Sequence, residues 1–174
     1  MMKRSIAFII FTILAGAGTV KAQNQSPDTT ARYFLIQASI GNLQEIASGK
    51  LAQQRATSPD VKAFAEMMVM DHSKVQAQIL EVAKESNIQL PIEATETPVP
   101  DRTLKIASDK DFDRLYVHIM VPGHRETIGL FENYAITGKN PIVKAFAKQT
   151  LPTFKKHLSE ITTIDNNMKD QSAK

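Results

Sequence analysis

Four stretches of the chain repeat apolar residues at spacings of three and four, which is the period of an amphipathic helix. They cover residues about 29–56, 59–86, 111–137 and 141–165. The second and fourth stretches carry unbroken stripes, and each stripe includes a histidine. The stripes are Val61, Ala65, Met68, His72, Val75, Ile79 and Val82 in the second, and Val143, Ala147, Thr150, Phe154, His157, Ile161 and Ile164 in the fourth. The pattern predicts four long helices.

The other two stripes are less uniform. The third holds Val117, Val121, His124, Ile128, Phe131 and Ala135, and the first holds Ile36, Ile40, Leu43, Ala47 and Leu51. Glu45 belongs to a different face of the first stretch, about 160° from Ile40 and Leu43 at 100° per residue, among small residues. This second face meets either a close neighbouring helix or solvent.

The boundaries between the stretches predict the topology. Ser58-Pro59 and Asn140-Pro141 are typical helix starts, and Gly138 is suited to a helix end. From residue 87 to about 110 the pattern is lost and three prolines interrupt it. About 20 extended residues reach roughly 66 Å, longer than a 28-residue helix of about 42 Å. We therefore expect an all-α, ferritin-like antiparallel four-helix bundle, with a long connection between helices two and three that can cross over.

The first 22 residues resemble a signal peptide. Lys3 and Arg4 precede an apolar run of about 12 residues, and Val20-Lys21-Ala22 offers small residues to a signal peptidase. A membrane-spanning helix needs roughly 20 apolar residues, so a permanent anchor is the weaker interpretation. We expect cleavage before Gln23, export, and a single domain over 23–174 without a transmembrane helix.

Charge and cysteine content exclude several classes of function. Removing Lys3, Arg4 and Lys21 lowers the basic residues from 21 to 18, equal to the 18 acidic residues. The mature chain therefore lacks the basic excess typical of nucleic-acid binding. The absence of cysteine excludes disulfides, thiolate catalysis and a lipid-modified N-terminal cysteine.

Several strings together resemble a known family. They are the stretch 34–52, Val61-Lys62-x-Phe64-Ala65-x-x-Met68-Val69-x-Asp71-His72, Phe112-Asp113-x-x-Tyr116, and Leu151-Pro152-Thr153-x-x-x-His157-Leu158. In this order they are similar to domain-of-unknown-function family 4142. The resemblance implies a ferritin-like bundle in exported bacterial proteins, periplasmic or outer-membrane associated, with no established activity. The family's second Met-Val-x-Asp-His motif ends in Pro122-Gly123-His124 here, which puts in doubt any role of that missing Asp in holding His124.

Three histidines occupy stripe positions that would otherwise hold Leu or Ile: His72, His124 and His157. Counted from the turns, these histidines and Glu45 all lie near mid-helix, within about one turn of a common layer. A buried imidazole without partners costs about 1–3 kcal/mol. One hypothesis is therefore a mid-bundle metal site of the three histidines, with Glu45 as a possible fourth ligand, for a Zn, Cu or Fe ion.

The alternative is a non-catalytic structural or interaction domain, in which the histidines form a hydrogen-bonded layer with Glu45, Asp71 or backbone carbonyls. A ferritin-type di-iron centre is disfavoured because no Glu precedes any of the three histidines by three residues. Asp71 either orients a histidine on another helix or faces water. We assign no catalytic residue, since the chain has no nucleophile elbow or nucleotide-binding fingerprint.

Two methionines suggest a copper variant of the metal hypothesis. Met68 lies four residues before His72, and Met120 lies four before His124, so each pair shares a helix face. Thioether ligands favour Cu(I), although Met is also an ordinary core residue. His118 does not share the His124 stripe and is expected at the surface.

Overall fold

The computed structural model describes residues 29–96 and 99–172, so the expected signal peptide at 1–22 lies outside the described residues. The described chain is all-α, as predicted. Its long helices are α1 (Thr29–Arg55), α2 (Pro59–Glu85), α4 (Asp109–Thr137) and α5 (Pro141–Ser172), and its short ones are η1 (Ile92–Ala94) and α3 (Arg102–Ile106). The expected boundaries agree closely except at the last helix, which continues to Ser172 instead of ending near 165.

Side-chain hydrogen bonds cap the N-termini of three of the long helices. Ser58 Oγ accepts from the Val61 amide at 3.5 Å ahead of α2, and Ser108 Oγ accepts from the Asp111 amide at 3.3 Å in α4. Asn140 Oδ1 accepts from the Val143 amide at 3.1 Å in α5. Each bond satisfies a first-turn amide that has no partner within the helix.

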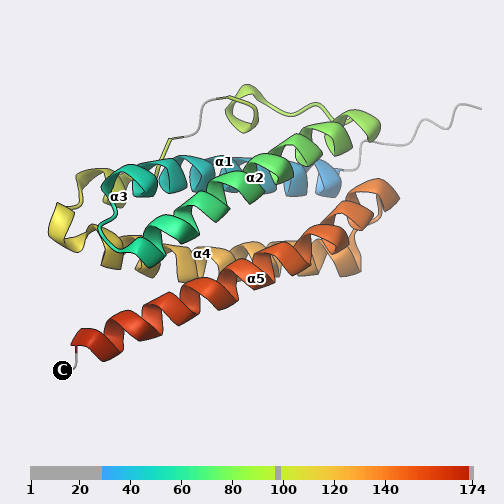
Figure 1. Ribbon diagram of the computed structural model, residues 1–174. Coiled ribbons are helices and arrows are strands. Elements are labelled where there is room, and N and C mark those ends of the chain that lie inside the picture. The colour runs from blue at the N-terminus through green and yellow to red at the C-terminus, as the bar shows by residue number, and fades with distance from the viewer. Residues whose placement is uncertain (1–28, 97–98, 173–174) are drawn as a thin grey trace, which may run out of the picture.

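The long helices pack as two pairs, α1 with α2 and α4 with α5 (Figure 1). At one end of the bundle, residues from the start of α1, the end of α2, the end of α4 and the start of α5 share one hydrophobic cluster. Its members include Phe34, Ile79, Phe131 and Phe146. At the other end a second cluster includes Ala52, Ala65, Tyr116 and Ile161. All neighbouring helices are therefore antiparallel.

A crossover segment, residues 86–96 and 99–108, joins the two pairs along α1 (Figure 1). Ser39 Oγ donates to the Ala94 carbonyl at 2.6 Å, and Ser48 Oγ accepts from the Asp101 amide at 3.1 Å. Farther along, Arg55 donates to the carbonyl of Ala107 at 2.7 Å. These contacts follow α1 from Ser39, in its first half, to Arg55 at its end. The long connection between the second and third long helices therefore crosses over, as the sequence allowed.

The inward face of α1 differs from the expected stripe. Ile40 is 40 % exposed, whereas Ala38 and Ala52 are buried at 6 % and 0 %. The reason is close packing against α2, since a Cβ at Gly49 would lie only 2.9 Å from Val69 Cγ2. Small side chains thus line the interface, and Ile40 instead faces a groove between α1 and the crossover segment.

Within the described residues, no helix combines the length and apolar character that a membrane span needs.

Candidate metal centre

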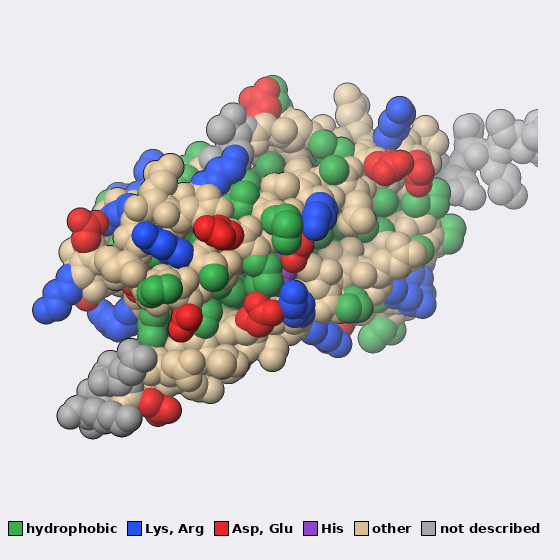
Figure 2. Space-filling view, in the orientation of Figure 1, with side chains coloured by type: hydrophobic (Ala, Val, Ile, Leu, Met, Phe, Trp, Pro, Cys, Tyr) green, Lys and Arg blue, Asp and Glu red, His purple; other side chains and the backbone are tan. Residues whose placement is uncertain are grey.

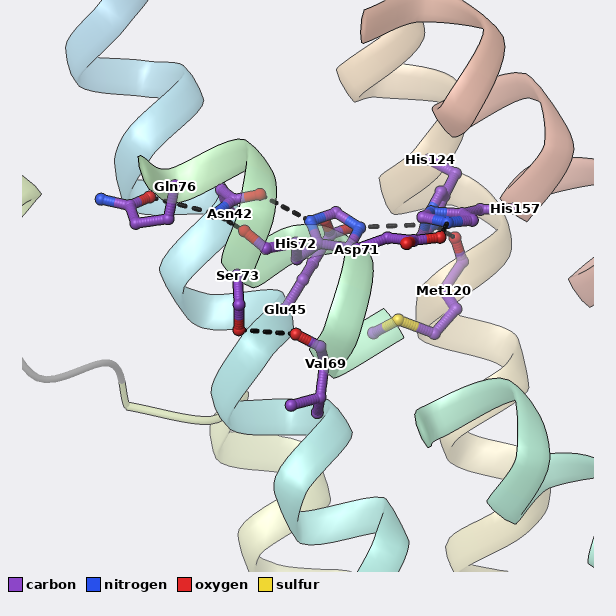
Figure 3. Close-up of polar contacts among 10 residues, drawn as sticks. All are labelled: Asn42, Glu45, Val69, Asp71, His72, Ser73, Gln76, Met120, His124 and His157. Atoms are coloured by element: carbon purple, nitrogen blue, oxygen red, sulfur yellow. Dashed lines mark hydrogen bonds and ion pairs between the residues drawn. The ribbon is translucent and has the colours of Figure 1, made fainter. Parts of the chain in front are cut away.

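Three histidines from three helices meet in the middle of the bundle (Figure 3). His72 comes from α2, His124 from α4 and His157 from α5, and all three are 0 % exposed. Their ring centroids lie 5.3 to 5.9 Å apart. One nitrogen from each ring lies within 4.8 Å of one from each of the others. The expected common layer of histidines is therefore present.

Each imidazole is held by a different acceptor through one nitrogen, here called the outer nitrogen. His72 Nδ1 donates to Asn42 Oδ1 at 2.7 Å, and His157 Nε2 donates to Asp71 Oδ2 at 3.2 Å. His124 Nδ1 donates to the Met120 carbonyl at 2.9 Å, one turn earlier in its own helix. His124 is thus held by a backbone oxygen of its own helix, without an acidic neighbour.

These acceptors set the tautomer of every ring. A carbonyl or a carboxylate only accepts, and the Asn42 amide is fixed because its Nδ2 donates to the His72 carbonyl at 2.9 Å. Each outer nitrogen therefore carries the proton, and the second nitrogen of the ring holds a lone pair. These are His72 Nε2, His124 Nε2 and His157 Nδ1, each buried with no hydrogen-bond partner in the described structure. We call them the inner nitrogens.

Burial keeps all three rings neutral. It lowers the pKa of His72 well below the usual value and that of His124 to about 4, because a charged imidazole is poorly solvated inside the bundle. Burial also lowers the pKa of His157, although the Asp71 carboxylate opposes this. Neutral imidazole is the form that ligates metal ions, so no proton has to leave these histidines before one binds.

Glu45 points inward, which the sequence left open. Its Oε2 lies 3.2 Å from His72 Nδ1 and its Oε1 lies 3.6 Å from His124 Nδ1, and the side chain is 12 % exposed. The carboxyl thus meets the outer nitrogens of two rings. Burial raises the pKa of Glu45 to about 8. This position suits a group that supports the ligating rings from behind.

Asp71 orients a histidine on another helix, one of the two roles expected for it. Its side chain is 18 % exposed and also pairs with Lys74 at 3.3 Å. The pKa of Asp71 is lowered: burial pushes it upward, but the contacts with His157 and Lys74 outweigh that effect. An ionised carboxylate therefore connects the buried His157 ring to the edge of the bundle.

A buried chain of amides, which the sequence did not reveal, supports His72. Asn42 Nδ2 donates to Gln76 Oε1 at 3.0 Å, and Gln76 Nε2 donates to Ser39 Oγ at 2.7 Å. Ser39 in turn donates to Ala94, so the chain joins the site to the crossover segment. One signal existed in the sequence: Asn42 lies three residues before Glu45 on the small-residue face.

Aromatic rings enclose the histidine layer. Phe154 stacks on His72, with centroids 5.4 Å apart and planes inclined by 23°. Phe64 approaches His124 and His157 edge-on at 6.3 and 6.4 Å. Apolar walls of this kind exclude water and leave the inner nitrogens without solvent partners.

The two methionines are buried in the hydrophobic cluster beside the site. Met68 is 0 % exposed and Met120 is 3 % exposed. In the view of Figure 3 the Met120 side chain extends away from the imidazole rings, and its contribution to the site is the carbonyl that holds His124. His118 is exposed, as expected.

The protein is thus an all-α bundle of long helices with a buried cluster of three histidines. Comparison with known proteins identifies its family. The model of DUF4142, a domain of unknown function, matches residues 16–164, so the chain belongs to that family. No curated protein matches it. The chain is similar in fold to the crystal structure of a DUF305 fragment from Deinococcus radiodurans, with a TM-score of 0.66. That match has 12 % identity and covers 82 % of this chain and 97 % of the other.

Proposed function

We propose that the protein binds one transition-metal ion through His72, His124 and His157. The observation that carries this proposal is the set of three inner nitrogens, each with a lone pair, each buried and each without a partner. An unpaired buried polar group costs about 1–3 kcal/mol of stability. One cation that accepted all three lone pairs would give each of the three inner nitrogens a partner.

The donor set favours a Zn, Cu or Fe ion. Three neutral imidazoles suit these metals and leave a fourth position for water or another ligand. The outer nitrogens already have the acceptors that orient metal-bound histidines in other proteins. In this proposal Glu45 supports the rings from behind and does not supply the fourth ligand, because its carboxyl meets the outer nitrogens of His72 and His124. A copper variant would also use the thioethers of Met68 and Met120, and unchanged Cu(I) binding after both are replaced with Leu would exclude these two ligands.

The proposed setting is the cell envelope. The basic residues, the apolar run and the small residues before Gln23 support export, and a neutral mature charge gives no support to nucleic-acid binding. We therefore propose a periplasmic or outer-membrane-associated metal-binding protein with no assigned catalysis.

A titration tests the metal site. Protein purified without an affinity tag and stripped with chelator would be titrated with Zn²⁺ and Cu²⁺, and bound metal would be counted by elemental analysis. We expect one ion per chain with Kd below about 1 μM. His72→Leu, His124→Leu and His157→Leu should each weaken binding about 100-fold or more, while His118→Leu, at an exposed histidine, should leave it unchanged. Absence of binding tighter than micromolar would rule out the proposal.

The second candidate is a structural histidine layer in an interaction domain. Two of the bonded outer nitrogens favour it, because those of His72 and His157 join α2 to α1 and to α5 without any ion. It predicts that histidine variants lose stability but that no metal binds, so the same titration separates the two functions.

A further inference from the structure

Two surface grooves lie along the line where α2 faces α5, which we call the α2–α5 seam. The first is lined from Val75 to Glu85 on α2 and from Ile142 to Thr153 on α5. The second is lined from Asp60 to Met67 on α2 and from Ser159 to Asn167 on α5. Asp71 and His157 occupy the short interval between the two grooves on their respective helices.

The contact between Asp71 and His157 therefore links the surface to the site. The Asp71 side chain is 18 % exposed, whereas that of His157 is 0 % exposed, and the two are 3.2 Å apart. The other two histidines lie within 5.5 Å of His157, measured between ring centroids. The carboxylate of Asp71 and the imidazole ring of His157 thus lie between the exterior of the seam and the inner nitrogens.

Both grooves carry negative charge. In the described part of the chain their linings include Glu81 and Glu85 in one and Asp60 and Glu160 in the other, with no Lys or Arg. Two basic side chains lie near the middle of the seam. Lys74 pairs with Asp71 and is 66 % exposed, and Lys156 pairs with Glu160 at 3.7 Å. Figure 2 shows a small area of histidine colour in this seam, next to acidic and basic side chains. Carboxylates along a concave surface concentrate cations near it.

We propose that the metal ion enters and leaves through the α2–α5 seam, and that Asp71 is the carboxylate that receives it and passes it to His157. This inference rests on the proposed metal site. Oxygen ligands bind an arriving, partly hydrated cation, and nitrogen ligands replace them as the ion loses water. Asp71 then returns to the outer nitrogen of His157, which it orients in the loaded protein. Lys74 competes with the incoming cation for the same carboxylate.

The opposite side of the bundle offers the rival path, through the other carboxyl that contacts the site. There Glu45 is 12 % exposed and packs beside Gly123, where an added Cβ would lie 3.8 Å from Glu45 Oε1. Neither groove of the seam is lined by Glu45, and its carboxyl contacts two ring nitrogens at once. The α2–α5 seam is therefore the better route.

Association kinetics of Co²⁺ with the metal-free full chain test the route, with the visible absorption of bound Co²⁺ as the signal in stopped flow at low ionic strength. Lys74→Gln removes the competing charge and should raise the association rate about threefold. Asp71→Asn keeps an acceptor for His157 but removes the charge, and should lower the rate about threefold or more. Lys155→Gln is the matched control, because Lys155 is 56 % exposed on α5 and pairs with Glu132 of α4, away from the seam.

The outcomes separate the route from the site itself. Opposite effects of Lys74→Gln and Asp71→Asn that fade in 0.5 M salt, with no change for Lys155→Gln, would support the seam. Unchanged rates in both seam variants, with equilibrium affinity for Co²⁺ retained by the parent protein, would overturn the route while leaving the metal site intact. A rate lowered by Glu45→Gln but not by Asp71→Asn would also overturn it and would place entry at α1 and α4. Absence of saturable Co²⁺ binding to the parent protein would overturn the metal site and the route together.

Discussion

Each imidazole of the candidate site has one satisfied nitrogen and one unsatisfied nitrogen. Three different acceptors hold the outer nitrogens, an amide, a backbone carbonyl and a carboxylate. All three fix the same outcome, a neutral ring with its lone pair on the inner side. Because one nitrogen of each ring is bonded, each to a different acceptor, and the other is not, the three histidines should respond differently to pH and to substitution.

Stability of the metal-free protein should be greatest near pH 6.5 to 7. Burial raises the pKa of Glu45 to about 8 from 4.5, so its stabilising contribution is lost as the pH rises through 8. The histidine pKa values are lowered, so the unfolded chain takes up protons first below about pH 6.5 and stability falls on that side as well. Urea unfolding in chelator should show a decrease of roughly 2 kcal/mol between pH 6.5 and 8. An equal alkaline decrease in Glu45→Gln would contradict this assignment.

His124→Leu and His72→Leu should differ in metal-free stability. His124 bonds to a carbonyl that also accepts within helix α4, and Glu45 keeps its shorter contact with His72 when the His124 ring is removed. The replacement therefore removes one unpaired buried nitrogen without leaving a backbone group unpaired. We expect a change between no effect and a gain of about 1 kcal/mol. His72→Leu leaves the buried Asn42 Oδ1 without its donor and should cost about 1–3 kcal/mol. Urea midpoints in chelator measure both; a large loss in His124→Leu would count against the tautomer argument.

The sequence predicted the layer of three histidines but not the groups that hold their rings. His72, His124 and His157 stood out because they replaced aliphatic residues in apolar stripes. The outer contacts were harder to predict, because Asn42 was marked only by its position three residues before Glu45 and the Met120 carbonyl is backbone, present at every position. Whether Glu45 faced inward depended on how closely α1 approaches its neighbours, which is a tertiary property.

At the scale of elements, the crossover segment explains the departures from the expected pattern. The segment runs along the Ile40 side of α1, so this part of the expected apolar stripe borders a groove beside a loop instead of packing against a helix. The face with small residues is then free to approach α2. Periodicity predicted the helices because each buries one face, but it could not distinguish which of two faces of α1 meets the core.

Arg55 should be the main anchor of the crossover segment. It donates to the carbonyls of Leu104 and Ala107, pairs with Asp109 at 2.7 Å, and lies 4.7 Å from the centre of the Phe112 ring. Arg55→Ala leaves two backbone carbonyls without donors and should lower the free energy of unfolding by about 2 kcal/mol. The control is Arg114→Ala, which removes only an exposed i,i+3 pair and should cost less than about 0.5 kcal/mol. Chemical denaturation measures both, and equal losses would show that Arg55 is not a special contact.

At the scale of the whole molecule, the histidine layer lies between two separate hydrophobic clusters. His72 belongs to the first helix pair, and His124 and His157 belong to the second. An ion bound by all three would connect the two pairs at their centre. The openings of α2 and α5 are also alike in sequence, with Pro-Asp-Val-Lys-Ala-Phe-Ala at 59–65 and Pro-Ile-Val-Lys-Ala-Phe-Ala at 141–147. This likeness fits the division into two hairpins, although His72 and His157 are not at equivalent positions after the two prolines.

Metal should therefore stabilise the entire fold. At a free Zn²⁺ concentration 100 times Kd, binding adds about 2.7 kcal/mol to the free energy of unfolding. For a chain of this size we expect a rise in Tm of about 5–10 °C in calorimetry. The shift should disappear in His124→Leu and persist in His118→Leu. A shift of equal size in His124→Leu would show that Zn²⁺ acts elsewhere on the molecule.

The placement of Glu45 and Asp71 has a consequence for the valence of the bound ion. The layer lies at mid-helix, beyond the first and last turns where helix dipoles act, and the histidines bring no charge. Two carboxyl groups, Glu45 and Asp71, contact the imidazoles. A cation nearby would lower the pKa of Glu45, so that both groups would be ionised. Ion and carboxylates would then sum to zero for a dication and to minus one for a monovalent ion, while Lys74 offsets Asp71 only from the exposed edge of the bundle. Neutrality of the buried charges would therefore favour a divalent ion in the proposed site.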